Sequence, residues 1–137
     1  MKIIVDTDVW SEAFRKKGNK SPFVGELRQL IHETRVQMTG TIRMEILCGI
    51  RDPNTFQNLR KSLAAFPDRE LDTDVFETAA KFFNLCRSKG IQGSNNDFII
   101  CACSVRWKMP ILTKDRDFTR YAKILPIDLV KPRVTKA

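Results

Sequence analysis

The sequence predicts a single α/β domain, in which a parallel sheet of four to five strands is flanked by helices. Residues 3–5 (Ile-Ile-Val) form an uninterrupted apolar run, as expected of a strand that is buried on both faces of a parallel sheet. Further short apolar runs alternate with longer segments of helical periodicity, which implies parallel strands joined by crossover helices. The chain of 137 residues is long enough for one domain with its own core.

Five runs are predicted as strands. Residues 36–38 follow the first strand, and a short strand is expected at 69–71. Residues 109–113 form the fourth strand. The last one, at 124–127, is expected at an edge of the sheet, because Pro126 has no N–H for a ladder hydrogen bond.

Capping residues and apolar spacing predict the helices. Ser21 is expected to cap a helix that has Pro22 at its first position, Pro53 opens another helix, and Gly90 suits a helix end. A capping box that starts at Thr41 would place its acid at position 44, which is Met44, so capping does not account for Glu45. The last predicted helix is apolar almost all round, which indicates a central position in the domain. The expected helices cover residues 9–14, 22–34, 42–50, 53–66, 74–89 and 98–105.

The charge balance favours a polyanionic partner. The chain has 24 Lys and Arg against 16 Asp and Glu, a net charge of +8. Nucleic acid is the leading candidate for such a basic protein, although basic charge can also serve solubility alone. The basic residues concentrate in the loop at 15–20 and in the later part of the chain, at Arg106, Lys108, Lys114, Arg116 and Arg120.

The cysteines do not indicate a zinc site. They lack Cys-x-x-Cys spacing and histidine neighbours, so we expect buried apolar side chains in a reducing compartment at Cys48, Cys86, Cys101 and Cys103. Neither a signal peptide nor an apolar run of membrane-spanning length is found. We therefore expect a cytoplasmic protein.

Acidic residues stand where the predicted strands end. Asp6 follows the first strand and Asp115 the fourth, and the carboxyl ends of parallel strands meet at one edge. Glu45 and Asp97 are expected in the first turns of helices that begin at this edge. A capping role would explain Asp97 after Ser94, or one acid of the pair Asp6 and Asp8, but it does not explain them all.

Four converging carboxylates require a counter-ion. Like charges at close range raise one another's pKa, and a divalent cation relieves the repulsion. Oxygen ligands without histidine or cysteine favour Mg²⁺ or Mn²⁺. Such ions can activate water against a phosphodiester, so the acidic cleft of a basic protein favours a nuclease.

Four segments together resemble the motifs of PIN-domain ribonucleases, and most closely the VapC toxins of toxin–antitoxin pairs. In chain order they are residues 3–10, 41–49, 96–102 and 112–118. The resemblance implies a PIN-like nuclease domain at 1–130, followed by a basic tail at 131–137 that we expect to be mobile. Asp8 departs from the family pattern, which usually has Ser or Asn there.

The resemblance also implies an activity and a site. The activity is that of a Mg²⁺- or Mn²⁺-dependent endoribonuclease, with a structured RNA such as tRNA or rRNA as substrate. The implied catalytic residues are Asp6, Glu45, Asp97, Asp115 and, in an auxiliary role, Asp117, and the first four are the implied metal ligands.

Two kinds of partner are implied by the same resemblance, a cognate antitoxin and a second copy of the chain. The helices at 53–66 and 74–89 carry more large apolar side chains than one face of a small sheet needs. Part of this set is expected in the core and part in a groove for an antitoxin helix or a homodimer contact. The set consists of Phe56, Leu59, Leu63, Phe66, Phe76, Phe82 and Phe83.

Two alternatives remain open from the residues alone. Asp6-Thr7-Asp8 after an apolar strand also matches the nucleophile motif of haloacid-dehalogenase-type phosphatases, with Asp6 as nucleophile and Asp8 as general acid. That hypothesis leaves Glu45 and Asp97 without a role. The second alternative is a non-enzymatic nucleic-acid-binding module, in which the acids only cap helices.

Overall fold

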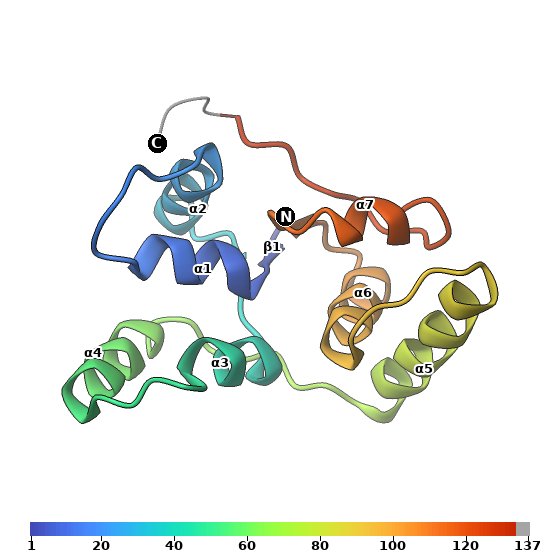
Figure 1. Cartoon of the computed structure of the whole chain (residues 1–137), viewed down its shortest axis with the longest axis horizontal. Coiled ribbons are helices and arrows are strands. Elements are labelled where there is room, and N and C mark those ends of the chain that lie inside the picture. The colour runs from blue at the N-terminus through green and yellow to red at the C-terminus, as the bar shows by residue number, and fades with distance from the viewer. Residues whose placement is uncertain (134–137) are drawn as a thin grey trace.

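A parallel sheet lies at the centre of the domain, with β1 as its middle strand (Figure 1). The computed structural model describes residues 1–133, and within them the sheet has three strands: β1 (Ile3–Val5), β2 (Val36–Gln37) and β3 (Ile111–Leu112). Ile4 pairs with Gln37 on one side and with Ile111 on the other. All three side chains of β1 are buried, as the apolar run predicts.

The predicted strands at 69–71 and 124–127 are wrong. In the described part of the chain, neither range forms a strand. A single parallel bridge lies next to each range, between Met38 and Asp68 and between Ile111 and Leu129. Residues 68–70 are exposed, so no buried surface stabilises a longer ladder there. Leu125 donates its N–H to the carbonyl of Tyr121 (2.7 Å), which continues a helical turn where a strand was expected.

Seven helices are described between residues 1 and 133. The helix that starts at Asp117 was not predicted from the sequence, and the others correspond to the expected helices with shifted ends. They are α1 (Thr7–Phe14), α2 (Pro22–His32), α3 (Gly40–Leu47), α4 (Pro53–Leu63), α5 (Thr73–Ser88), α6 (Asn95–Trp107) and α7 (Asp117–Tyr121).

The structure shows how α2 and α3 begin. Thr39 caps α3, since its hydroxyl accepts a hydrogen bond from the N–H of Ile42 (3.2 Å). Ser21 precedes α2 but makes no capping bond, which corrects the prediction, and its hydroxyl instead donates to Glu12 (2.5 Å). Pro22 and Pro53 occupy early helical positions as predicted, and Gly90 has the positive φ of a helix-terminating glycine.

The helices form two groups that meet at the sheet. Figure 1 shows α1, α2, α3 and α4 on one side of β1 and α5, α6 and α7 on the other. α1 contacts α2 and α3, whereas α5 packs along α6, which in turn contacts β3. As predicted, α6 is deeply buried, with Phe98, Ile100 and Cys101 nearly inaccessible. The carboxyl edge of the sheet therefore receives side chains from both groups.

The segment after residue 130 was expected to be a mobile tail, but its described part is anchored. Arg133 donates to the buried Glu26 (Nη2 to Oε2, 2.7 Å) and pairs with Glu33 (3.0 Å) on the exposed side of α2. The expectation for residues 134–137 lies outside the described residues.

The cysteines are all free, and three of the four are buried as expected. Cys48 is exposed, because it lies at the end of α3, and this corrects the prediction for that residue. Among the described helices, none combines the length and apolar character that a membrane crossing requires.

Candidate functional site

Asp6 lies at the carboxyl end of β1, where the chain turns into α1. Its Oδ1 accepts a hydrogen bond from the N–H of Thr7 (2.8 Å), so it caps α1 as the simpler interpretation proposed. Its Oδ2 accepts from the hydroxyl of Thr113 (2.7 Å), which a cap alone does not explain. Burial and then the charge of Asp8 raise the pKa of Asp6 to about 7.

Asp8 faces the loop after β3. Its Oδ2 accepts from the N–H of Lys114 (3.1 Å), while its Oδ1 is buried with no hydrogen-bond partner among the described residues. Burial raises the pKa of Asp8, and the charge of Asp115 adds to this rise. The extra acid at position 8 thus belongs to the same electrostatic environment as the predicted site.

A buried glutamate holds the lysine of that loop. Glu12 on α1 pairs with Nζ of Lys114 (3.2 Å) and accepts from the N–H of Ser21 (2.9 Å). Burial alone would raise the pKa of Glu12, but the hydrogen bonds from Ser21 and Lys114 outweigh it and lower the pKa to about 2. The ion pair ties the segment next to Asp115 to α1.

Glu45 reaches the site from the second turn of α3, not the first turn as expected. Its Oε1 accepts a hydrogen bond from the hydroxyl of Thr7 (3.1 Å), which fixes it beside the end of β1. Its charge contributes to raising the pKa of Asp97, after burial and the charge of Asp115. Glu45 therefore lies beside the end of β1, although it is 38 residues from Thr7 in the chain.

Three aspartates form the tightest part of the site. One carboxylate oxygen from each of Asp97, Asp115 and Asp117 lies within 4.8 Å of the others. Asp6 and Glu45 stand at the same edge, outside this closest group. The structure thus brings three of the five predicted site residues within reach of one ion, Asp117 among them, while Asp6 is linked to this segment through Thr113 and Glu45 is bonded to Thr7.

Local hydrogen bonds shape the segment that carries Asp115 and Asp117. The N–H of Asp115 donates to the hydroxyl of Thr113 (3.1 Å), and the N–H of Asp117 donates to Oδ1 of Asp115 (2.9 Å). Asp117 also pairs with Arg120 (2.7 Å) one turn along α7. These bonds turn both carboxylates back toward the edge of the sheet.

Asp97 stands in the first turn of α6, where its N–H donates to the hydroxyl of Ser94 (3.1 Å), as the capping interpretation predicts. Its Oδ2 accepts a second bond from the phenol of Tyr121 (2.6 Å). Burial, followed by the bond to Asp97, raises the pKa of Tyr121, so the phenol remains a donor.

Several site residues were missed by sequence reasoning. Two of them had a local signal in the sequence. Thr113 lies between the predicted strand and Asp115, and Thr7 directly follows Asp6. Nothing local indicated Glu12 or Tyr121, whose partners lie far away in the chain.

The donor set fits a hard divalent cation. The ligands on offer are carboxylate oxygens, with no thiolate or imidazole among them. Burial and the charges of neighbouring acids raise the pKa values of Asp6, Asp8 and Asp97, because the surrounding protein does not fully neutralise these negative charges. A bound cation would relieve this deficit.

Fold and site define an α/β protein with an acidic, all-oxygen centre at the carboxyl edge of a parallel sheet. The family model described as the PIN domain matches residues 3–124. The chain belongs to the PIN-domain family, as the resemblance of its four motifs predicts.

Curated relatives place the chain near the VapC proteins of this family. It is 34% identical over 126 residues to the ribonuclease VapC11 of Mycobacterium tuberculosis and to a VapC ribonuclease of Mycobacterium bovis. The match covers 89% of this chain and 92% of each relative.

Solved structures support the fold over almost the whole chain. FitAcB from Neisseria gonorrhoeae has a TM-score of 0.76 at 20% identity, covering 95% of this chain and 97% of that one. VapBC2 from Rickettsia felis, solved with a DNA fragment from its promoter, has a TM-score of 0.77 at 14% identity, covering 95% and 98%. The phosphatase and the non-enzymatic alternatives find no support in these comparisons.

Proposed function

We propose that this chain is an endoribonuclease that acts in the cytoplasm as the toxin of a toxin–antitoxin pair. The observation that carries the proposal is the convergence of Asp6, Glu45, Asp97 and Asp115 on one edge of a PIN-type sheet. The VapC ribonucleases among its relatives support the same activity. Residues 1–130 form the proposed nuclease domain.

The proposed cofactor is Mg²⁺ or Mn²⁺, with Asp6, Glu45, Asp97 and Asp115 as its ligands, directly or through water, and Asp117 in an auxiliary role. When bound, the ion supplies an activated water and charge compensation at the phosphodiester. The protein side chains orient this centre: Thr113 holds Asp6, and Thr7 holds Glu45.

The proposed substrate is a structured RNA, such as tRNA or rRNA. Arg106, Lys114 and Arg120 are already paired with Asp74, Glu12 and Asp117. Arg15 in the loop that leaves α1 also pairs with Glu12 (3.6 Å), whereas Lys16 and Lys17 of the same loop are exposed. We therefore propose that Lys16 and Lys17 contribute to the attraction of the RNA phosphate backbone.

One experiment tests the activity. The pure protein is incubated with total RNA and, separately, with a generic phosphomonoester, each with Mg²⁺, with Mn²⁺ and with a chelator. We expect metal-dependent cleavage of RNA and no release of phosphate from the monoester. Phosphate release that depends on Asp8, with the RNA intact, would instead establish phosphatase chemistry.

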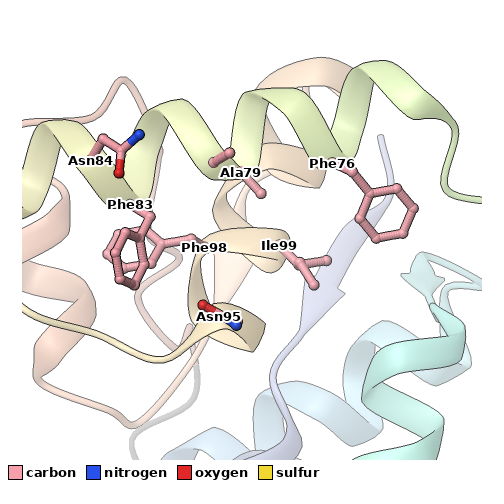
Figure 2. Close-up of a pocket in the computed structure, with 8 residues that line it drawn as sticks. Phe76, Ala79, Phe83, Asn84, Asn95, Phe98 and Ile99 are labelled. Atoms are coloured by element: carbon pink, nitrogen blue, oxygen red, sulfur yellow. The ribbon is translucent and has the colours of Figure 1, made fainter.

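The proposed protein partners are an antitoxin and a second copy of the chain. A cavity of about 340 Å³ lies between α5 and α6. Figure 2 shows two of its aromatic side chains from α5, with Phe83 against Phe98 and Phe76 on the side of Ile99. Phe76 is 49% exposed, so part of the predicted apolar set is available at the surface. Leu63, in contrast, is fully buried, and Phe66 packs on Trp10 (5.1 Å) in the core.

We propose that the antitoxin places an arginine or lysine against the carboxylates of the site. Near Asp97, this side chain would occupy the position of the metal ion. We expect the chain to be toxic when expressed alone and to co-purify with the product of a neighbouring gene. Its Asp6→Asn variant should be harmless. A wild-type chain that is monomeric, harmless and without partners in its native cells would contradict the toxin assignment and leave the nuclease chemistry intact.

A further inference from the structure

Tyr121 is completely buried, and its hydroxyl, the polar group of the side chain, points toward Asp97 of the acidic site. It ends α7, and its ring packs between Phe98 (centroids 4.9 Å apart) and Phe118 (5.1 Å). Its hydroxyl donates to Oδ2 of Asp97 at 2.6 Å. A phenylalanine would fill the same apolar space, so packing alone does not explain the hydroxyl.

The chain makes room for this hydroxyl at Gly93. A Cβ atom at position 93 would stand 2.1 Å from the hydroxyl oxygen of Tyr121 and 2.7 Å from the ring carbon that bears it. It would also meet the ring of Phe98 at 3.0 Å. Gly93 has no positive φ, so the need for glycine at this position is one of space and not of backbone conformation.

We infer that Tyr121 is a positioning residue for Asp97, fixing the rotation of its carboxylate toward Asp115 and Asp117. The inference rests on the proposed metal-dependent function. Asp97 is held at two points, since its backbone N–H donates to the hydroxyl of Ser94 and its Oδ2 accepts from the hydroxyl of Tyr121. Hydrogen-bond donors behind metal-binding carboxylates typically change metal affinity about 10- to 100-fold when removed.

A competing explanation is that the hydroxyl only stabilises the fold. A buried hydrogen bond to a carboxylate also contributes to stability, and its loss would lower the melting temperature without a specific effect on metal. The two roles separate when metal binding and unfolding are measured on the same variant. Removing the hydroxyl while keeping the ring isolates the contact with Asp97.

The test compares Tyr121→Phe with wild type by calorimetric titration of Mn²⁺ into metal-free protein and by thermal unfolding in chelator. The matched control is Thr119→Val, which removes the hydroxyl of another α7 residue that donates to a backbone carbonyl (Arg116, 2.6 Å) and not to the site. RNA cleavage is measured over a range of Mn²⁺ concentrations.

We expect Tyr121→Phe to bind Mn²⁺ about 10-fold more weakly, to need correspondingly more Mn²⁺ for cleavage, and to unfold in chelator within a few degrees of wild type. Thr119→Val should bind as wild type does. Unchanged Mn²⁺ affinity in Tyr121→Phe would overturn the inference and leave the proposed function standing. Weakened Mn²⁺ binding in a protein that cleaves no RNA would support the inference and refute the function, whereas a wild-type protein that binds no Mn²⁺ would refute both.

Discussion

The hydroxyl of Thr113 links Asp6 to the segment that carries Asp115. It donates to Oδ2 of Asp6 at 2.7 Å and accepts from the N–H of Asp115 at 3.1 Å. Asp6 and Thr113 lie 107 residues apart in sequence, and each directly follows one of two neighbouring strands, β1 and β3. One side chain thus sets the spacing between two proposed metal ligands.

Replacing Thr113 by valine should therefore reduce RNA cleavage about 10-fold or more while leaving the fold intact, because valine keeps the shape but removes both hydrogen bonds. Thr113→Ser retains the hydroxyl and should keep most of the activity. The measurement is the initial rate of RNA cleavage, with circular dichroism to confirm folding. Equal losses in the two variants would argue against the hydroxyl as the cause.

Asp115 and Asp117 should not be equivalent. Asp115 comes almost directly after β3 and takes part in the Thr113 network, whereas Asp117 shares its charge with Arg120 (2.7 Å). Asp115→Asn should abolish cleavage, and Asp117→Asn should weaken it in a way that added Mn²⁺ partly restores. Cleavage rates at rising Mn²⁺ check this order, which two equal and unrescued losses would contradict.

Asp6 should destabilise the metal-free protein at neutral and higher pH. Burial and Asp8 raise its pKa from an ordinary value of 3.8 to about 7, so the folded state holds a proton that the unfolded state releases between these values. Stability is therefore lost as pH rises through this window, by about 2–4 kcal/mol at pH 8.

Asp6→Asn removes this titration. In chelator, the variant should be more stable than wild type at pH 8, and its advantage should shrink as the pH is lowered to 5. Urea unfolding at a series of pH values measures the difference. An advantage that does not vary with pH would show that Asp6 is ionised in the folded protein.

Arg133 should contribute to stability, because it is the partner of a carboxylate on α2 that is almost inaccessible. Glu26 is 1% exposed and receives several hydrogen bonds from Arg133. Arg133→Ala removes the guanidinium partner of Glu26 and should lower stability, though less than loss of a fully buried pair would, since the arginine itself is half exposed.

The control for this change is Lys131→Ala, which removes an exposed basic residue of the same segment. The hydrogen bonds from Arg133 lower the pKa of Glu26 against the effect of burial, so the contribution is present above pH 4.5 and is lost as the pH falls below it. Urea unfolding at pH 7 and at pH 3 measures both effects. An equal loss of stability in Lys131→Ala would show that the effect of Arg133→Ala comes from the change in net charge and not from the pair with Glu26.

The central strand and its acids could be predicted from sequence because their signals are local. An apolar run followed at once by Asp6, or by Thr113 and then Asp115, identifies both the strand and its carboxyl end. Glu45 and Asp97 followed from the same logic, since helices that begin at this edge carry them. Glu45 lies in the second turn and not in the first, because α3 begins at Gly40 with Thr39 as its cap.

The remaining features depend on contacts between distant segments. Whether residues 69–71 form a strand depends on burial that only the tertiary structure determines, and Arg69 and Glu70 are exposed there. Tyr121 looks like any aromatic core residue until its hydroxyl is placed 2.6 Å from Asp97. Arg133 looked like part of a free basic tail because its partner Glu26 lies 107 residues away.

The most direct measurement of the central claim is RNA cleavage by four single variants, Asp6→Asn, Glu45→Gln, Asp97→Asn and Asp115→Asn, each with saturating Mg²⁺ or Mn²⁺. Every change keeps the size of the side chain and removes one charge from the acidic edge. We predict that all four lose cleavage, with rates falling by about 100-fold or more, while their folds and thermal stabilities in chelator equal or exceed those of wild type. Full cleavage by any one of these variants would contradict a single metal-dependent centre built from the four carboxylates.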